Sequence, residues 1–377
     1  MLRLPTLLLL APLALLGCPT TGPADDEDPN TGEAPDTGMA VDTSETGMNV
    51  ELPDVSDTIT YRQLDTHPGC STVGLSDPAS IPGYTCAAKE FVGTEDTSKP
   101  IVLLIHGNSD SPAVFETFDP KPCDVMDKTF VPPDMLTEQL LPMGYRMLAV
   151  DMRFDLVDDD PVDNFAQNMD HGWGVPIVQH FLESVLEAYP DRQIAIVAHS
   201  FGVTVVRDAI RRLYINDGVD VFSRIDDMIL LAGANHGVST FELLCGLNPT
   251  MAGSVACEMG SRAAYSPTEF LTPNNGPEGA FETPCSTGES AFGRTDACNG
   301  HSVAYTTVVM QDKGNGEQQD LFVSEASSRL EGADNQLIGL QDFDISFYGP
   351  ACGALANHYG AARAQAAIDI ILARLAD

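Results

Sequence analysis

The chain is poor in basic residues: 19 Lys and Arg stand against 55 Asp and Glu, and the formal net charge is −36 at pH 7. A protein that binds a nucleic-acid duplex needs a basic surface to neutralise phosphates, and anionic lipid surfaces attract basic segments in the same way. The shortage of cations therefore argues against both kinds of partner. The excess of carboxylates favours solubility.

The chain also lacks an apolar segment at its amino terminus that is long enough to span a bilayer comfortably. Met1-Leu2-Arg3 precedes the apolar stretch Leu4–Leu16, a pattern that is typical of a secretory signal. We therefore interpret residues 1–17 as a signal peptide and expect the protein to be exported.

No two cysteines have the C-x-x-C spacing of a structural zinc site. The signal ends in Leu15-Leu16-Gly17-Cys18, which resembles the lipobox of bacterial lipoproteins. The resemblance implies that Cys18 is acylated and anchors the chain to the bacterial envelope or cell surface. The alternative is an ordinary cleaved signal and a secreted protein.

Removing Cys18 from the nine cysteines leaves an even number in an oxidising compartment, which predicts disulfides. Eight cysteines allow 105 pairings, and the sequence does not choose among them. We expect three local pairs and two remaining cysteines: Cys70–Cys86, Cys245–Cys257 and Cys285–Cys298, with Cys123 and Cys352 left over.

Residues 18–58 are expected to form a disordered acidic tether. From Pro19 to Asp57 the sequence is rich in Thr, Gly, Pro, Asp and Glu, has no Lys or Arg, and has few residues able to fill a core. Behind a lipidated Cys18, this tether would hold a folded domain away from a membrane. The alternative is a leader without a spacing role.

From residue 59 onward, short apolar runs alternate with amphipathic helical patterns, which is typical of a mostly parallel sheet flanked by helices. The predicted strands are Ile101–Ile105, Tyr145–Val150, Ile194–Ala198, Met228–Ala232, Ala304–Met310 and Gln336–Leu340. The predicted helices are Pro133–Met143, Pro176–Tyr189 with Pro176 in the first turn, Val203–Tyr214 and Ala361–Leu375. We therefore expect one α/β domain over residues 59–377.

Residues 240–300 interrupt this alternation. The segment is rich in Gly, Pro, Asn and Ser and contains four cysteines, Cys245, Cys257, Cys285 and Cys298. We expect a disulfide-rich insertion over one end of the sheet, either as a roof above an active site or as a stapled excursion.

The strongest chemical motif lies between the strand Ile194–Ala198 and the following helix, in the pentapeptide Ala198-His199-Ser200-Phe201-Gly202. A strand, a tight turn at a serine and a helix form a nucleophile elbow, and the small residues Ala198 and Gly202 relieve crowding around Ser200. The alternative is a plain turn in which Ser200 caps the helix.

A nucleophilic serine needs a base, and the base needs an acid to orient it. In this type of fold the order along the chain is serine, acid, histidine. His358 follows any acid that could come after the strand Ala304–Met310 and is the predicted base. Asp320 and Asp312 both follow that strand; we favour Asp320, because the apolar residues after it could anchor it, and Asp312 stays the alternative.

An ester carbonyl under attack becomes an oxyanion, which needs preorganised N–H donors. The elbow supplies the backbone N–H of Phe201, and the loop after Ile101–Ile105 supplies that of Asn108, next to Gly107. His106 in the same loop is expected to be structural.

These motifs together resemble α/β-hydrolase lipases whose pentapeptide begins with alanine, over about Pro100–Gly237 and Ala304–Asp377. The resemblance implies an α/β-hydrolase fold, a Ser200–Asp320–His358 triad and an oxyanion hole at Asn108 and Phe201. The stretch Asp320–Ile338 resembles the one that follows the family's acid.

The resemblance implies a serine hydrolase that cleaves carboxylic esters, a lipase or carboxylesterase, through an acyl-enzyme and without a cofactor. The alternatives are a polyester depolymerase or an acyltransferase on the same scaffold, or a non-catalytic cell-surface binding module. An acidic loop with Asp155, Asp158, Asp159, Asp160 and Asp163 either holds calcium or is a solvated loop; its spacing does not match an EF-hand, so we favour the solvated loop and predict no metal site. Trp173 either lines an acyl cleft or packs as an ordinary aromatic.

Overall fold

The computed structural model of the chain describes residues 78–108, 110–117, 134–152, 171–215, 217–235, 237–238, 303–311, 323–330, 333–339 and 358–376. Three segments predicted from the sequence lie outside these residues: the signal peptide (1–17), the tether (18–58) and the insertion (240–300). Cys86 is disulfide-bonded. Its predicted partner Cys70 and the other cysteines lie outside the described residues.

The described residues form a seven-stranded sheet in the order β1-β3-β2-β4-β5-β6-β7. β1 runs antiparallel to β3, and every other neighbouring pair is parallel. This is the strand order of an α/β-hydrolase, so the predicted fold class is confirmed. The strands are β1 (Ala88–Phe91), β2 (Ile101–Ile105), β3 (Met147–Val150), β4 (Ile194–His199), β5 (Ile225–Leu231), β6 (Ala304–Gln311) and β7 (Asp334–Gly339).

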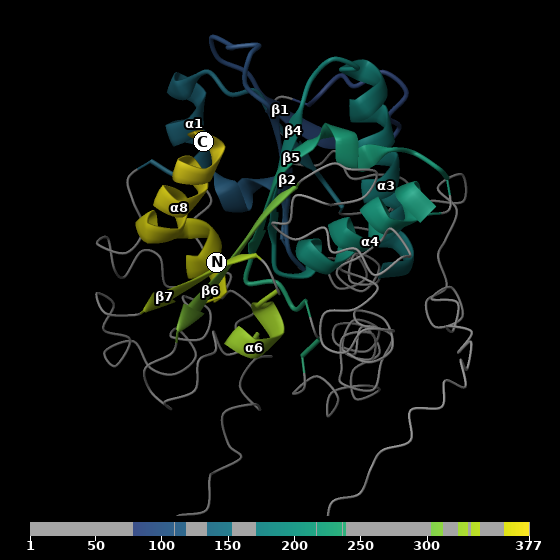
Figure 1. The fold of residues 1–377 in the computed structure, drawn as a ribbon. Helices are drawn as coiled ribbons and strands as arrows, with labels where there is room; N and C mark the ends of the chain where they lie inside the picture. The colour runs from purple at the N-terminus through teal and green to yellow at the C-terminus, as the bar shows by residue number, and fades with distance from the viewer. Residues whose placement is uncertain are drawn as a thin grey trace, which may run out of the picture. The chain divides into compact units, whose positions relative to one another are not determined.

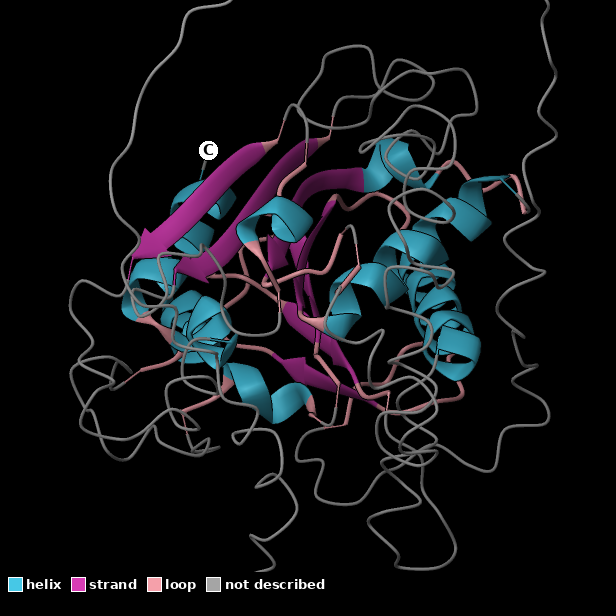
Figure 2. Ribbon diagram, turned by 90° about the horizontal axis from the view of Figure 1, so that it is seen from below, coloured by secondary structure: helices cyan, strands magenta, loops and turns pink. Residues whose placement is uncertain are grey.

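Helices cover both faces of the sheet (Figure 1). α3 (His171–Ala188) and α4 (Phe201–Ile215) pack on one face, and α1 (Leu136–Leu140) and α8 (Gln365–Ala376) pack on the other. Figure 2 shows the strands between these two layers from below. Shorter helical segments are η4 (Pro112–Phe115), η6 (Leu141–Met143), η7 (Val221–Arg224) and α6 (Glu325–Ser328).

The interior strand β2 shows why the sheet needs two layers of helices. Its side chains alternate between two hydrophobic cores, with Leu103 in the core under α3 and α4 and Leu104 in the core under α1 and α8. Both are fully buried. A strand covered on both faces is apolar at every position, and the observed bounds of β2 are those predicted.

α3 differs from its prediction at the amino end. The helix begins at His171, so Pro176 lies inside it rather than in its first turn. Proline inside a helix removes one backbone hydrogen bond at a cost of about 3 kcal/mol. Phe181 and Leu182 on the apolar face of α3 are fully buried, and this packing outweighs the lost bond.

β1 is an edge strand that the sequence patterns did not predict. It carries Lys89, which is 5% exposed and lies 2.7 Å from the carboxylate of Glu116, itself 2% exposed. The outer side of β1 is covered by the chain just before it: Pro78 bridges to Lys89, and the Ala79 N–H donates to the Ala88 carbonyl at 2.8 Å.

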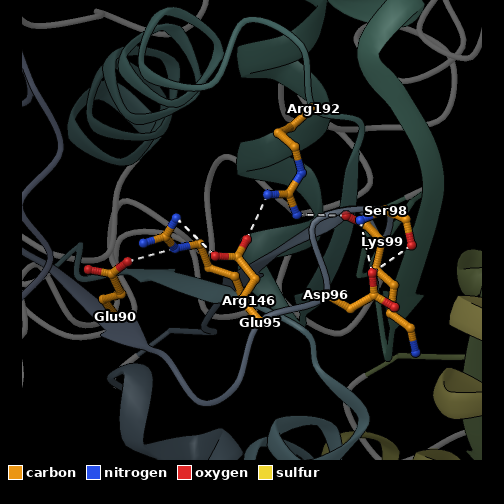
Figure 3. A network of polar contacts seen from close by, with 7 residues as sticks. All are labelled: Glu90, Glu95, Asp96, Ser98, Lys99, Arg146 and Arg192. Atoms are coloured by element: carbon orange, nitrogen blue, oxygen red, sulfur yellow. Dashed lines mark hydrogen bonds and ion pairs between the residues drawn. The ribbon is translucent and has the colours of Figure 1, made fainter.

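A polar network joins the amino ends of β2, β3 and β4 (Figure 3). Arg146 lies 2.8 Å from Glu90 and 3.4 Å from Glu95, and Arg192 donates to Glu95 at 2.6 Å and to the Lys99 carbonyl at 2.7 Å. These contacts stabilise the end of the sheet opposite to the carboxyl end of β4.

In the part of the chain that is described, no helix is long and apolar enough to cross a membrane.

The turn that leads into β2 is held by Asp96. Its carboxylate accepts hydrogen bonds from the Ser98 backbone at 3.0 Å and from the Ser98 hydroxyl at 2.6 Å. The bonds from Ser98 lower the pKa of the Asp96 carboxyl. The Asp96 N–H donates to the Gly144 carbonyl at 2.9 Å, at the residue where η6 ends with φ of 88°.

Candidate active site

Ser200 occupies the turn between β4 and α4. Its φ of 54° lies in the left-handed region, which is costly for a residue with a Cβ and marks a strained turn. Two backbone bonds fix it: the Ser200 N–H donates to the Leu231 carbonyl at 2.8 Å, and the Val203 N–H donates to the Ser200 carbonyl at 3.0 Å. The turn therefore has the strand–turn–helix form of a nucleophile elbow.

Two glycines allow neighbouring segments to approach this turn. A Cβ on Gly202 would lie 2.4 Å from the His106 carbonyl oxygen and 2.9 Å from that of Ile105, which are distances that real contacts do not show. A Cβ on Gly107 would lie 2.9 Å from the Cβ of Ser200. The start of α4 and the loop after β2 therefore pack directly against each other at Ser200.

His358 reaches Ser200 from the carboxyl-terminal part of the chain. Its Nε2 atom lies 2.7 Å from the Ser200 hydroxyl oxygen, across a sequence separation of 158 residues. His358 lies in a helical turn, described over residues 358–363, that precedes α8. This distance is within the range needed for proton transfer between a serine and a base.

The two predicted oxyanion residues belong to the two segments that meet at Ser200. Phe201 is the first residue of α4, and Asn108 follows Gly107 in the loop after β2. The first N–H groups of a helix have no partner within the helix, and the helix dipole adds partial positive charge there. The start of α4 therefore favours a negative charge beside Ser200.

His106 supports the loop and does not contact the Ser200 hydroxyl. It is fully buried; its Nδ1 lies 2.8 Å from the Gly107 carbonyl oxygen, and its Nε2 accepts the Met152 N–H at 3.0 Å. The carbonyl can only accept, so Nδ1 carries the proton of the neutral ring. Asp151, also fully buried, lies 3.7 Å from Nε2.

A buried network ties α4 to the loop after β5 and to α6. Arg207 donates to the Asn235 side-chain oxygen at 2.8 Å, and the Asn235 amide donates to the Ser328 carbonyl at 2.6 Å. The Ser327 hydroxyl donates to the Gly237 carbonyl. The sequence gave no signal for these partners of Asn235, because Arg207 and Ser328 lie on other elements.

Both candidate acids, Asp320 and Asp312, lie outside the described residues. β6 ends at Gln311 and α6 begins at Glu325, so both candidates belong to the connection between these elements. The acidic loop at Asp155–Asp163 is also outside, as is the Trp173 side chain. Among the residues that are described, no group of three or more His, Cys, Asp or Glu could hold a metal ion.

A pocket of about 400 Å³ is lined mostly by residues of α3, and Ser200 is not among its lining residues. Burial lowers the pKa of His180 in its wall. Burial raises the pKa of the neighbouring Glu183, and the negative charges of Asp217 and Glu187 raise it further. The lining residues are Gly83, His180, Glu183, Ser184, Leu186, Glu187 and Val219.

Two residues beside the site were not predicted to contribute to it. His199 lies inside the pentapeptide, yet its sequence position did not reveal that its side chain contacts the backbone of His358. Arg363 follows His358 in an alanine-rich stretch, is 1% exposed, and donates to the Val114 carbonyl at 2.5 Å. For Arg363, the signal available in the sequence was a single arginine among alanines.

Residues 158–278 match a protein family described as Lipase (class 2). The match includes the elbow at Ser200 and stops before Asp320 and His358. A comparison with curated proteins found no match.

Among solved structures, the chain is similar to the mature form of the Bacillus licheniformis lipase BlEst2, with 17% identity, a TM-score of 0.43, and 78% of this chain and 99% of that chain covered. It is also similar to lipase B of Aspergillus fumigatus, with 15% identity, a TM-score of 0.41, and 86% and 65% covered. At these identities and TM-scores, the similarities say nothing about the reaction that the chain catalyses.

Proposed function

We propose that the chain is a serine hydrolase that cleaves carboxylic esters, of the lipase or carboxylesterase type. The observation that carries the proposal is the 2.7 Å separation between the Ser200 hydroxyl and His358 Nε2, at a serine held in a strained turn between β4 and α4. The match of residues 158–278 to class 2 lipases supports the choice of ester as substrate.

In this mechanism His358 Nε2 takes the hydroxyl proton as Ser200 Oγ attacks the ester carbonyl. The backbone N–H groups of Phe201 and Asn108 stabilise the resulting oxyanion. The tetrahedral intermediate collapses, His358 donates the proton to the departing alcohol, and an acyl group remains on Ser200. Water, activated by the same histidine, then releases the acid. No cofactor takes part.

The acid of the triad is Asp320 in this proposal, and Asp312 is the alternative. Both lie in the connection after β6, in the order serine, acid, histidine that this fold uses. Separate Asp320→Asn and Asp312→Asn variants distinguish them, because removing the orienting acid costs several powers of ten in kcat. A loss confined to Asp312→Asn would assign the role to Asp312.

The proposal extends to the compartment. The chain is exported and anchored to a membrane through a lipidated Cys18, and the disulfide at Cys86 supports an oxidising location. Mass spectrometry of the mature amino terminus distinguishes an acylated Cys18 from an ordinary cleaved signal.

The central test is hydrolysis of p-nitrophenyl butyrate and p-nitrophenyl palmitate by the purified full chain. We expect Ser200→Ala to lose activity by about 10⁴-fold or more. The matched control is Ser223→Ala, because the Ser223 hydroxyl in η7 donates to the carbonyl of Asp220, which precedes that helical segment. Equal rates for wild type and Ser200→Ala would reject the proposal.

Two further assays, with a polymer film and with an added alcohol, separate the related activities. A polyester depolymerase would release soluble acids from a polymer film, and an acyltransferase would favour an added alcohol over water as acceptor. A binding module would hydrolyse none of these substrates. Comparison across acyl chain lengths identifies the preferred ester.

A further inference from the structure

His199 precedes Ser200 in the chain, and its side chain is 1% exposed at the end of β4. Its Nε2 atom lies 3.0 Å from the backbone carbonyl oxygen of His358. A carbonyl oxygen can only accept a hydrogen bond, so His199 Nε2 must carry the proton and donate it.

The His199 ring is enclosed by the segments that build the site. Its centroid lies 5.1 Å from that of the His358 ring and 5.9 Å from that of the Tyr359 ring. On the side of the loop after β2, a Cβ on Gly107 would lie 3.2 Å from His199 Nδ1. The imidazole therefore has little room to rotate away from the His358 carbonyl.

Two consecutive residues thus hold one histidine. The Ser200 hydroxyl contacts the imidazole of His358, and the His199 imidazole binds its backbone. The bond from His199 fixes the position of the His358 backbone, and the contact with the Ser200 hydroxyl fixes the position of its Nε2 atom. A displacement of about 1 Å between reacting groups can lower the rate about 10²-fold. A shift of His358 after loss of the backbone bond would therefore slow the reaction at Ser200.

We propose that His199 is a positioning residue: its Nε2–H bond to the His358 carbonyl keeps His358 within proton-transfer distance of Ser200. The inference rests on the proposed function for its catalytic consequence. It also predicts an effect on the order of His358 that does not depend on any ester being hydrolysed.

The matched variants are His199→Gln and His199→Met, which are similar in size and flexibility. Gln keeps an N–H donor at about the reach of Nε2, and Met removes it. A remote histidine, His180 on α3, provides the control His180→Met, because its ring contacts Thr85 and Tyr84 rather than the site.

The first readout is the rate at which diethyl pyrocarbonate modifies His358, followed by mass spectrometry of the full chain after digestion. We expect His358 in His199→Met to react at least about five times faster than in wild type, and His199→Gln and His180→Met to stay near wild type. Equal rates in the Met and Gln variants would overturn the inference, whether or not the protein hydrolyses esters.

The second readout is catalytic, with p-nitrophenyl butyrate as substrate. We expect kcat of His199→Met to fall about 10- to 100-fold with KM within about threefold, and His199→Gln to recover most of the loss. Thermal unfolding of each variant shows whether it is folded. If wild type hydrolyses the ester and His199→Met matches it, the inference fails and the proposed function stands. If wild type hydrolyses no ester, the proposed function fails and the modification rates still decide the inference.

Discussion

Gly107 is the residue through which the loop after β2 touches the nucleophile. An added methyl group would stand 2.9 Å from the Ser200 Cβ and 3.2 Å from His199 Nδ1, so either the loop or the elbow has to move. We expect Gly107→Ala to lower kcat by about 10- to 100-fold and the free energy of unfolding by about 1–3 kcal/mol. Ester hydrolysis and chemical denaturation measure the two effects.

Gly93→Ala is the matched control for this substitution. A Cβ on Gly93 would lie 3.5 Å from the Leu141 side chain, which is an ordinary contact distance. We expect both quantities to stay near wild type in this variant. A Gly107→Ala protein as active as Gly93→Ala would mean that the loop does not need its close approach to Ser200.

For single residues, the sequence predicted Ser200 as nucleophile and His358 as its base. This prediction needed only the order of the residues along the chain and their positions relative to the predicted strands and helices. The 2.7 Å contact itself depends on how the chain folds across a sequence separation of 158 residues. The contact between His199 and the His358 backbone is of the same tertiary kind, and no local pattern indicates it. The roles of Asp320 and Asp312 stay predictions, because both residues lie outside the described part of the chain.

Among the elements, the helical turn 358–363 carries His358 at one end and Arg363 at the other. Arg363 donates to the carbonyl of Val114, inside η4, and η4 follows the loop that contains Gly107 and Asn108. This hydrogen bond therefore joins the segment that follows β2 to the helical turn 358–363, and both segments approach Ser200.

We expect Arg363→Met to lower the free energy of unfolding by about 2 kcal/mol, because the buried Val114 carbonyl loses a charged donor. Arg363→Lys should lose less, since it keeps a charged donor. Urea denaturation measures both. The control is Arg374→Met: Arg374 pairs with Asp334, and its side chain is 30% exposed, so we expect at most about 1 kcal/mol. Equal losses at both arginines would contradict a bracing role for Arg363.

The elements differ in how well the sequence predicts them. β2 is apolar at all five positions because both of its faces are covered, and its bounds were predicted correctly. β1 was missed because it contains Lys89, and the residue that neutralises this lysine, Glu116, lies 27 positions away. The start of α3 was misplaced because Pro176 indicated a first turn where tertiary packing extends the helix.

Over the whole molecule, the net charge of −36 produces repulsion that favours the unfolded chain. Salt shortens the range of this repulsion from about 30 Å at 0.01 M to about 3 Å at 1 M. We expect the melting temperature to rise as NaCl increases from 0.01 M to 0.5 M. Differential scanning calorimetry measures it, and tetramethylammonium chloride at equal ionic strength controls for specific sodium binding. A falling melting temperature would mean that ion pairs such as those of Figure 3 outweigh the repulsion.

The covering of β1 by the chain before it bears on what happens at high protein concentration. An open strand edge offers unpaired backbone groups to a second molecule and can seed aggregation. Here the Ala79 N–H already occupies the Ala88 carbonyl, and Pro78, beside Lys89, has no N–H to offer. A short piece of the chain's own backbone therefore opposes the addition of a strand from a second molecule on this side of the sheet. Removing residues 78–81 would leave the edge of β1 open to such pairing.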